Sequence, residues 1–310
     1  MRHLSVGIFH DENLGRELGK KGTESDIVLC HKKTQDCIYT FMHPVGDKLS
    51  SKTQIIQSID AAIIVCSTLS AEVGETILLL DAVGINKGLI VVPAFSDTTQ
   101  MKRLLQDTSL AGFPIVERNL HTIMGLLEQI NPERDNTSPP IVVIDHAFTV
   151  KGVGEIILGF VKKGVVHKHD KLLLTPGGKE ILVRSIQMQD ADFETAPAGA
   201  RVGLALKGAS IDELKRGCIL CSPGSIQTSS TGLLSFQKNK FYPEVKNGVF
   251  HVTVGMQTVP VTITAVSHES LQIQLDRLIG FSKDDTFLLF DLNAKKLHLI
   301  GKGKMLSSEV

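Results

Sequence analysis

Two cysteines, Cys218 and Cys221, form the C-x-x-C spacing that thiol redox sites and zinc sites use. They lie in the run G-C-I-L-C-S-P-G, whose composition indicates a strand. Residues three apart on a strand point to opposite faces, so a shared metal ion is geometrically awkward. With Cys30, Cys37 and Cys66 they make an odd, scattered set of five, which suits a reducing compartment better than a disulfide framework. We therefore expect packed thiols and no metal site.

Clustered lysines are the second group with candidate chemistry, because ammonium groups neutralise the phosphates of RNA. The clusters comprise Lys162, Lys163, Lys168 and Lys171, and further on Lys295, Lys296, Lys302 and Lys304. The whole chain, however, has 33 basic and 33 acidic residues and a formal net charge of zero. A nonspecific nucleic-acid binder usually has an excess of basic residues. Any RNA contact must therefore come from local patches, and a solvated loop charge is the alternative for each lysine.

Length and composition limit the class of protein. The chain has 310 residues, enough for two or three domains with their own cores. Its 42% hydrophobic and 21% charged residues are typical of soluble globular proteins. No window approaches the eighteen or so consecutive apolar residues of a membrane span. Because Met1 to Leu4 leads directly into a strand-like run, we expect no signal peptide and a cytoplasmic protein.

Residues 1–135 alternate strand and helix signals. Apolar runs of buried-strand length lie at 6–9, 26–29, 38–41, 61–65 and 89–92. Spacings of three and four between apolar residues predict helices, one with Met101, Leu104 and Leu105 on its apolar face and another with Leu120, Ile123, Met124, Leu127 and Ile130. This alternation predicts a mostly parallel, doubly wound sheet with helices on both faces.

The rest of the chain reads as strands. A polar, proline-rich segment precedes it, and we expect residues 136–140 to be the linker. Between 144 and 174, three apolar, β-branched runs separated by glycines and other turn residues predict a small closed β-barrel over 141–225. Further runs of strand length predict a second barrel over 226–310. The expected fold class is thus α/β plus all-β.

Several strings of the first predicted barrel resemble a known family. D-H-A-F-x-V-K-G-x-G at 145–154, G-x-V-x-x-G-x-V at 159–166, A-P-A-G-A-R-V-G-L-A-L-K-G at 196–208 and R-G-C-I-L at 216–220 are similar to the second domain of the elongation-factor-Tu family of translational GTPases. Within that family the likeness is strongest to the archaeal selenocysteine-specific factor SelB and to its paralogue proposed for pyrrolysyl-tRNA. V-G-M-Q-T-V-P-V-x-I, from residue 254, resembles the third domain of SelB.

This resemblance implies a GTPase domain at residues 1–135, so its phosphate loop should read G-x-x-x-x-G-K-[ST] between a strand and a helix. The chain offers H-D-E-N-L-G-R-E from His10 to Glu17. Gly15 matches, Arg16 keeps only the charge of the lysine, and Glu17 replaces the hydroxyl that holds magnesium. A carboxylate about 4 Å from a phosphate repels it by roughly 1–4 kcal/mol. The alternative is that acidic side chains cap the helix and fill the anion site themselves.

Two other nucleotide motifs of the family are also eroded. Its D-x-P-G-H matches His43 to Asp47, where Gly46 is retained and Asp47 replaces the catalytic histidine. Its guanine-reading N-K-x-D matches Ala94 to Asp97, where Asp97 alone remains. We therefore expect a degenerate P-loop GTPase-like domain with Gly15, Arg16, Gly46 and Asp97 as remnants of a nucleotide site. No catalytic residue and no cofactor are expected, and GTP with magnesium stays doubtful.

The family's second domain binds the aminoacyl group and terminal adenosine of tRNA. The matching residues are Asp145, His146, Phe148, Leu158 and Arg201. The resemblance implies that Phe148 stacks on a base or amino-acid group, that Arg201 and His146 donate hydrogen bonds, and that Asp145 holds an α-amino group. An arginine at 201 resembles the selenocysteine factor, whose pocket favours an anionic side chain. The alternative for Arg201 is a salt bridge at the barrel rim.

Three functions follow as hypotheses. The first is an elongation factor that carries a specialised aminoacyl-tRNA to the ribosome, with GTP binding and hydrolysis lost. The second is an unconventional but active GTPase. The third is a regulatory or scaffold pseudo-GTPase of the translation machinery. We expect a monomer that reads no mRNA hairpin, since no residues remain for the fourth domain of SelB, and that contacts no membrane.

Overall fold

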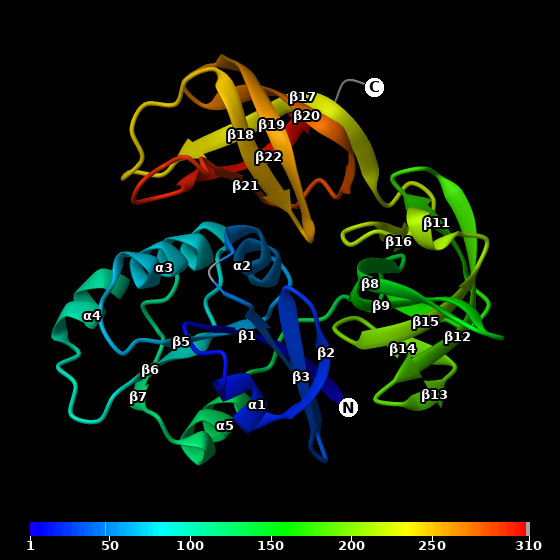
Figure 1. The fold of residues 1–310 in the computed structure, drawn as a ribbon, viewed down its shortest axis with the longest axis horizontal. Helices are drawn as coiled ribbons and strands as arrows, with labels where there is room; N and C mark the ends of the chain where they lie inside the picture. The colour runs from blue at the N-terminus through cyan, green and yellow to red at the C-terminus, as the bar shows by residue number, and fades with distance from the viewer. Residues whose placement is uncertain (47, 308–310) are drawn as a thin grey trace. The chain divides into compact units, whose positions relative to one another are not determined.

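A computed structural model describes residues 1–46 and 48–307 (Figure 1). The chain forms an α/β domain followed by two closed antiparallel β-barrels, which confirms the predicted fold class. It divides into two compact units. One contains Met1–Pro132, Lys238–Pro243 and Leu288–Lys302. The other contains Glu133–Gln237, Glu244–Phe287 and the chain from Gly303 onward.

The α/β domain is built on a seven-stranded sheet in the order β2-β3-β4-β1-β5-β6-β7. The strands β4, β1, β5, β6 and β7 run parallel, and β2 and β3 add an antiparallel edge. Their bounds are β1 (Arg2–Phe9), β2 (Lys20–Glu24), β3 (Ile27–Lys33), β4 (Cys37–Pro44), β5 (Ala61–Val65), β6 (Gly88–Val92) and β7 (Ile115–Glu117). The five predicted strands are all present. The apolar pattern missed β2 and β7, because β2 is polar and exposed and β7 has only three residues.

The helices are α1 (Leu14–Leu18), α2 (Leu49–Ile56), α3 (Ala71–Val83), α4 (Thr99–Leu105) and α5 (Leu120–Glu128). Local chemistry sets the ends of α3, because the Ser70 hydroxyl accepts from Val73 N at 3.3 Å and Gly84 ends the helix with φ +82°. The apolar faces predicted for α4 and α5 need correction, because Leu104 and Leu120 are exposed. No helix in the described part of the chain is long and apolar enough to cross a membrane.

The first barrel closes through the order β11-β16-β8-β9-β15-β12, with β12 pairing back to β11. Alternate residues of its strands form one core, for example Ile144, Ile157 and Leu204. The strands of this region are β8 (Ile141–Val150), β9 (Gly154–Lys163), β10 (Val165–His167), β11 (Lys171–Thr175), β12 (Lys179–Met188), β13 (Ala191–Phe193), β14 (Thr195–Pro197), β15 (Arg201–Lys207) and β16 (Ile219–Cys221).

The second barrel closes through the order β17-β20-β19-β18-β21-β22. Its strands are β17 (Gln227–Lys238), β18 (Gly248–Val254), β19 (Gln257–Val266), β20 (Ser270–Phe281), β21 (Phe287–Phe290) and β22 (Leu299–Ser307). Buried and exposed residues alternate along β19 and along the first half of β20, as a barrel wall requires.

The predicted linker is held against the first barrel. Asp135 O accepts from Gly164 N at 2.7 Å, and Asn136 Oδ1 accepts from Ala198 N at 2.9 Å. The Asp135 carboxylate also accepts from the Ser138 hydroxyl and from the amides of Ser138 and Thr137, which lowers its pKa to about 2. The polar composition indicated a connecting segment, and these contacts fix its conformation.

Candidate functional site

The carboxyl ends of the parallel strands lie at one edge of the α/β sheet, where such folds bind ligands. The loop after β1 begins with His10, whose φ of +67° is the left-handed conformation that usually requires glycine. Its ring is held in place, with Nε2 2.9 Å from Thr76 Oγ1 on α3. The helix α1 that follows has only five residues, so little helix remains to bind a phosphate at its N-terminus.

Asp11 occupies the amides that would face an anion in this loop. Its Oδ1 accepts from Asn13 N at 2.8 Å and from Leu14 N at 2.9 Å, and its Oδ2 pairs with Arg118 Nη1. Partial burial would raise the pKa of Asp11, but Arg118 and the two amides outweigh it, so the pKa lies below its usual value. The Asp11 carboxylate therefore already binds two backbone amides and one guanidinium in this loop.

The remaining acidic residues of the loop are also engaged. Glu12 Oε1 accepts from Gly46 N at 3.0 Å, and Glu17 Oε1 lies 2.9 Å from Arg118 Nη2. Arg16 is 3.2 Å from Glu24 Oε1 and largely exposed, so it does not act as a buried counterpart of a phosphate-loop lysine. The amide of Gly46 and the guanidinium of Arg16 thus already have carboxylate partners.

Three further residues complete this edge. Gly15 is buried with His43, and a Cβ at position 15 would stand 3.3 Å from His43 Cδ2. Burial lowers the pKa of His43 below its usual value. Asp97 is exposed after β6, and its Oδ1 accepts from Thr99 N at 2.9 Å. Asp47, which replaces the family's catalytic histidine, lies outside the described residues.

The first barrel separates the five predicted tRNA-binding residues into two groups. Asp145 is 3% exposed, sits at a bulge of β8, and its Oδ2 accepts from Arg201 Nη1 at 3.0 Å. Arg216 adds a second guanidinium, with Nε 3.0 Å from Asp145 O and 3.5 Å from Asp145 Oδ1. Arg201 also lies over the Phe160 ring, 5.0 Å from its centroid, and burial lowers the pKa of Arg201. These residues form a buried ion cluster, which is the salt-bridge alternative for Arg201.

The second group lies on the outer surface of the same barrel. Ala147 packs on the core, so His146 and Phe148 on either side of it point outward. Their ring centroids are 6.0 Å apart. Leu158 stands opposite His146 on β9, and Gly203 stands opposite Leu158 on β15. A side chain at Gly203 would touch Leu158, so the glycine leaves space beside this apolar and aromatic surface.

Sequence reasoning did not find Arg118, which belongs to no recognised motif, and it gave no role to Arg216, although the string R-G-C-I-L at 216–220 contains it. It also offered the lysines of the first barrel as RNA ligands. Each of the four has a carboxylate partner, since Lys162 pairs with Asp285, Lys163 with Asp284 at 3.9 Å, Lys168 with Glu194 at 3.1 Å and Lys171 with Glu180 at 3.2 Å. Cys218 and Cys221 pack in two different apolar clusters, so the expected opposite orientation of the two thiols is confirmed.

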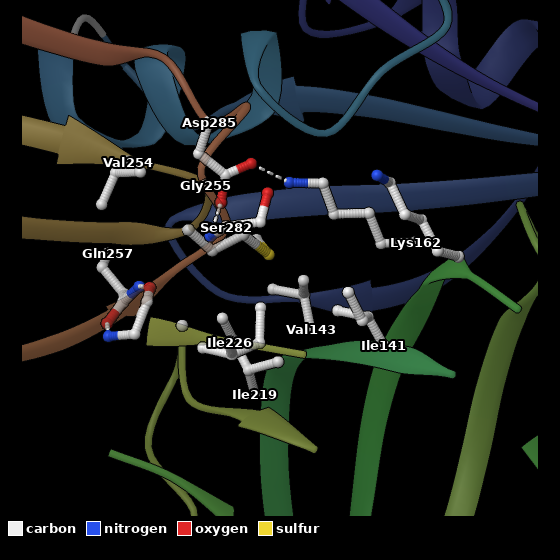
Figure 2. Close-up of a pocket in the computed structure, with 14 residues that line it drawn as sticks. Ile141, Val143, Lys162, Ile219, Ile226, Val254, Gly255, Gln257, Ser282 and Asp285 are labelled. Atoms are coloured by element: carbon white, nitrogen blue, oxygen red, sulfur yellow. Dashed lines mark hydrogen bonds and ion pairs between the residues drawn. The ribbon is translucent and has the colours of Figure 1, made fainter. Parts of the chain in front are cut away.

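Figure 2 shows a pocket lined by both barrels within one compact unit. The Lys162 ammonium and the Asp285 carboxylate pair at its rim. The Gln257 side-chain amide bonds to both backbone groups of Gly280, since Nε2 donates to Gly280 O at 2.6 Å and Oε1 accepts from Gly280 N at 3.2 Å. The charged and amide groups of the pocket are thus paired with other groups of the protein, and we assign no ligand to the pocket.

Comparisons with known proteins agree with this architecture. Residues 154–221 match the family described as elongation factor Tu domain 2. An uncharacterised protein of Methanocaldococcus jannaschii is 38% identical over 98% of this chain and 100% of its own length. The selenocysteine-specific elongation factors of M. jannaschii and Mus musculus are 31% and 28% identical over 71% and 52% of this chain. The chain spans only 52% and 31% of the lengths of these two factors.

Solved structures share the whole fold. Translation elongation factor SelB from Methanococcus maripaludis, in complex with the GTP analogue GppNHp, superposes with a TM-score of 0.86 at 23% identity, over 100% of this chain and 80% of that one. Its apo form gives a TM-score of 0.83 at 24% identity, over the same shares. A parallel α/β domain followed by two barrels of this kind defines the translation elongation factor fold. The chain belongs to the elongation factor Tu family, in the branch that contains the SelB-like proteins.

Proposed function

We propose that the protein binds a specialised aminoacyl-tRNA for delivery to the ribosome and has lost GTP binding and hydrolysis. The proposed tRNA binding rests on the surface of His146, Phe148 and Leu158 on the first barrel. Two aromatic rings and an apolar side chain on rigid strands suit an adenine ring or an aminoacyl group, because a base stacks on an aromatic side chain with about 1–3 kcal/mol. The similarity of this chain to the elongation factors named above supports this proposal.

The ion cluster of Asp145, Arg201 and Arg216 would contribute its electric field to aminoacyl binding, because its side chains are already paired with one another. Asp145 accepts from Arg201 and lies next to Arg216, so two guanidiniums share one carboxylate. An acidic group on the aminoacyl moiety would gain from that positive field. The Asp145–Arg201 pair would have to open before either residue could contact the amino acid directly.

The loss of the nucleotide cycle is inferred from the carboxylates at the sheet edge. Asp11 and Glu12 occupy three backbone amides, and a phosphate would have to displace both. Each carboxylate left about 4 Å from a phosphate costs roughly 1–4 kcal/mol in electrostatic repulsion. We therefore expect neither GTP nor GDP to bind in the micromolar range.

The first experiment is calorimetry of the full chain with GTP and GDP in the presence of magnesium, up to millimolar nucleotide. We expect no binding heat. The variant Asp11→Asn with Glu12→Gln removes two negative charges at nearly constant shape, and we expect it to bind GDP at least about tenfold more tightly than the wild type. Micromolar binding by the wild type would instead support the unconventional GTPase.

The second experiment measures binding of aminoacylated and deacylated tRNA by filter retention. We expect Phe148→Ala to weaken binding of the aminoacylated form roughly 5- to 150-fold through the loss of stacking. Phe193→Ala is the matched control, because Phe193 is an exposed aromatic residue of β13 in the same region. Equal effects of the two variants, or no tRNA binding by the wild type, would favour the regulatory or scaffold protein. In either role we propose a cytoplasmic monomer.

A further inference from the structure

The carboxyl edge of the α/β sheet exposes one large apolar side chain after each of four parallel strands. Val45 follows β4, Leu69 follows β5, Phe95 follows β6, and Leu120 follows β7. Each of the four is at least 40% exposed. Exposed apolar residues are common singly, but a set gathered at one edge of a sheet marks an interaction site. We call these four residues the edge patch.

Hydrogen bonds join the loops that carry three of the four residues of the edge patch, Val45, Phe95 and Leu120. Glu12 accepts from Gly46 N, next to Val45. Asp11 in the same loop pairs with Arg118, two residues before Leu120. Glu117 Oε1 in turn accepts from Phe95 N at 3.2 Å. The loops of Val45, Phe95 and Leu120 are therefore preorganised, and a partner would bind them without ordering these three loops.

Phe95 is the most unusual member. Its side chain is 100% exposed, and its φ of +60° is left-handed, a conformation that bulky residues rarely adopt. An exposed aromatic ring on a strained backbone gains nothing for the fold of the isolated chain. Strain of this kind concentrates at functional sites. The hydrogen bond from Phe95 N to Glu117 Oε1 ties the backbone that carries the exposed ring to the end of β7.

The charge around the edge patch points to the chemistry of that partner. The loops and the element ends beside them carry six carboxylates, namely Asp11, Glu12, Glu17, Glu72, Asp97 and Glu117. The described basic residues of the same segments are Arg16, Lys48, Lys52 and Arg118, which leaves an excess of two negative charges. Such a surface repels the phosphates of RNA, and it repels a second copy of itself. It complements a basic surface.

We propose that the edge patch docks a protein partner that presents an apolar pocket surrounded by lysine and arginine, with Phe95 inserted in that pocket. The place where related folds hold a nucleotide thus serves as a protein interface. This interface uses other residues than the tRNA surface of the first barrel, and it does not depend on that assignment. Aromatic residues at the centre of an interface typically carry most of its binding energy.

The test selects a random 16-residue peptide library displayed on phage against the full chain. Phage that bind the Phe95→Ala variant are removed first. We expect the surviving peptides to be rich in Lys, Arg and apolar residues. Synthetic copies should lose at least about tenfold in affinity on Phe95→Ala, a change that exceeds 1 kcal/mol. Phe241→Ala is the matched control, because Phe241 is also a mostly exposed phenylalanine, in the loop after β17, and should leave the affinity unchanged.

Other outcomes would overturn the proposal. These are the absence of peptides that distinguish Phe95→Ala from the wild type, or the recovery of acidic peptides. Displacement of the peptides by GTP would show that the edge still belongs to a nucleotide. Sedimentation equilibrium is run beside the selection. A dimer of the wild type that Phe95→Ala dissociates would also overturn the proposal.

Discussion

The buried cluster of Asp145, Arg201 and Arg216 leads to a prediction about stability. The variant Asp145→Asn keeps the shape of the side chain and removes its charge. Asp145 is 3% exposed, and the side chains of Arg201 and Arg216 are 14% and 22% exposed. Leaving such guanidiniums without their carboxylate costs about 3–5 kcal/mol in buried pairs. Because both arginines retain some contact with water, we expect the lower end, about 3 kcal/mol.

Native-state hydrogen exchange measures this loss locally, which avoids assuming that a chain of several domains unfolds in one step. Amides of β8 and β15 should exchange roughly 150-fold faster in Asp145→Asn than in the wild type, since 1.4 kcal/mol corresponds to a factor of ten. Amides of β5 in the α/β sheet should be unchanged and serve as the internal reference.

The double variant Asp145→Asn with Arg201→Met tests whether charge is the cause. Removing both partners of a buried pair often restores stability, so we expect most of the loss to be recovered. Exchange in the single variant within threefold of the wild type would refute the reasoning. Asp145 and Arg201 would then be only weakly coupled, and both would be available to a ligand, as the family resemblance implied.

Two further predictions concern a buried histidine and a crowded glycine. Burial lowers the pKa of His43, so the unfolded chain binds its proton more readily, and the free energy of unfolding should fall as the pH drops below about 6.5. In urea unfolding between pH 7 and 5, His43→Gln should flatten this fall, and an unchanged slope would contradict it. Gly164→Ala places a Cβ 2.5 Å from Ser138 O and should cost roughly 1–3 kcal/mol more than Gly178→Ala, which has a similar φ but open space. Equal urea midpoints for the two alanine variants would show that this contact relaxes freely.

The sequence predicted the architecture well because its signals are local and redundant. Continuous apolar runs such as 61–65 correspond to buried parallel strands, and alternation along 257–263 corresponds to a barrel wall. Exposed or short elements such as β2 and β7 carry no such pattern. Helix α3 was also missed, because it is apolar nearly all round and has no clear stripe. The predicted domain boundaries stay a prediction.

The site was harder to predict because its contacts join residues far apart in the chain. The sequence predicted that Asp11 and Glu12 would repel a phosphate, but not that Arg118 would pair with Asp11. It grouped Asp145 and Arg201 with His146 and Phe148 by motif. The bulge of β8 buries Asp145, which pairs with Arg201 of β15, while His146 and Phe148 are exposed. A one-residue shift of this kind leaves no trace in composition or spacing.

The left-handed backbone at His10 bears on how reversible the change in the α/β domain is. A glycine-based loop can lose its glycine and keep its shape only if the new side chain tolerates positive φ, and histidine does so more readily than most residues. The mutational path back to a phosphate site therefore requires no remodelling of this turn. It requires the replacement of Asp11, Glu12 and Glu17. If the proposed loss of nucleotide binding holds, these three carboxylates, and not the shape of the turn, are what keeps a phosphate out of this loop.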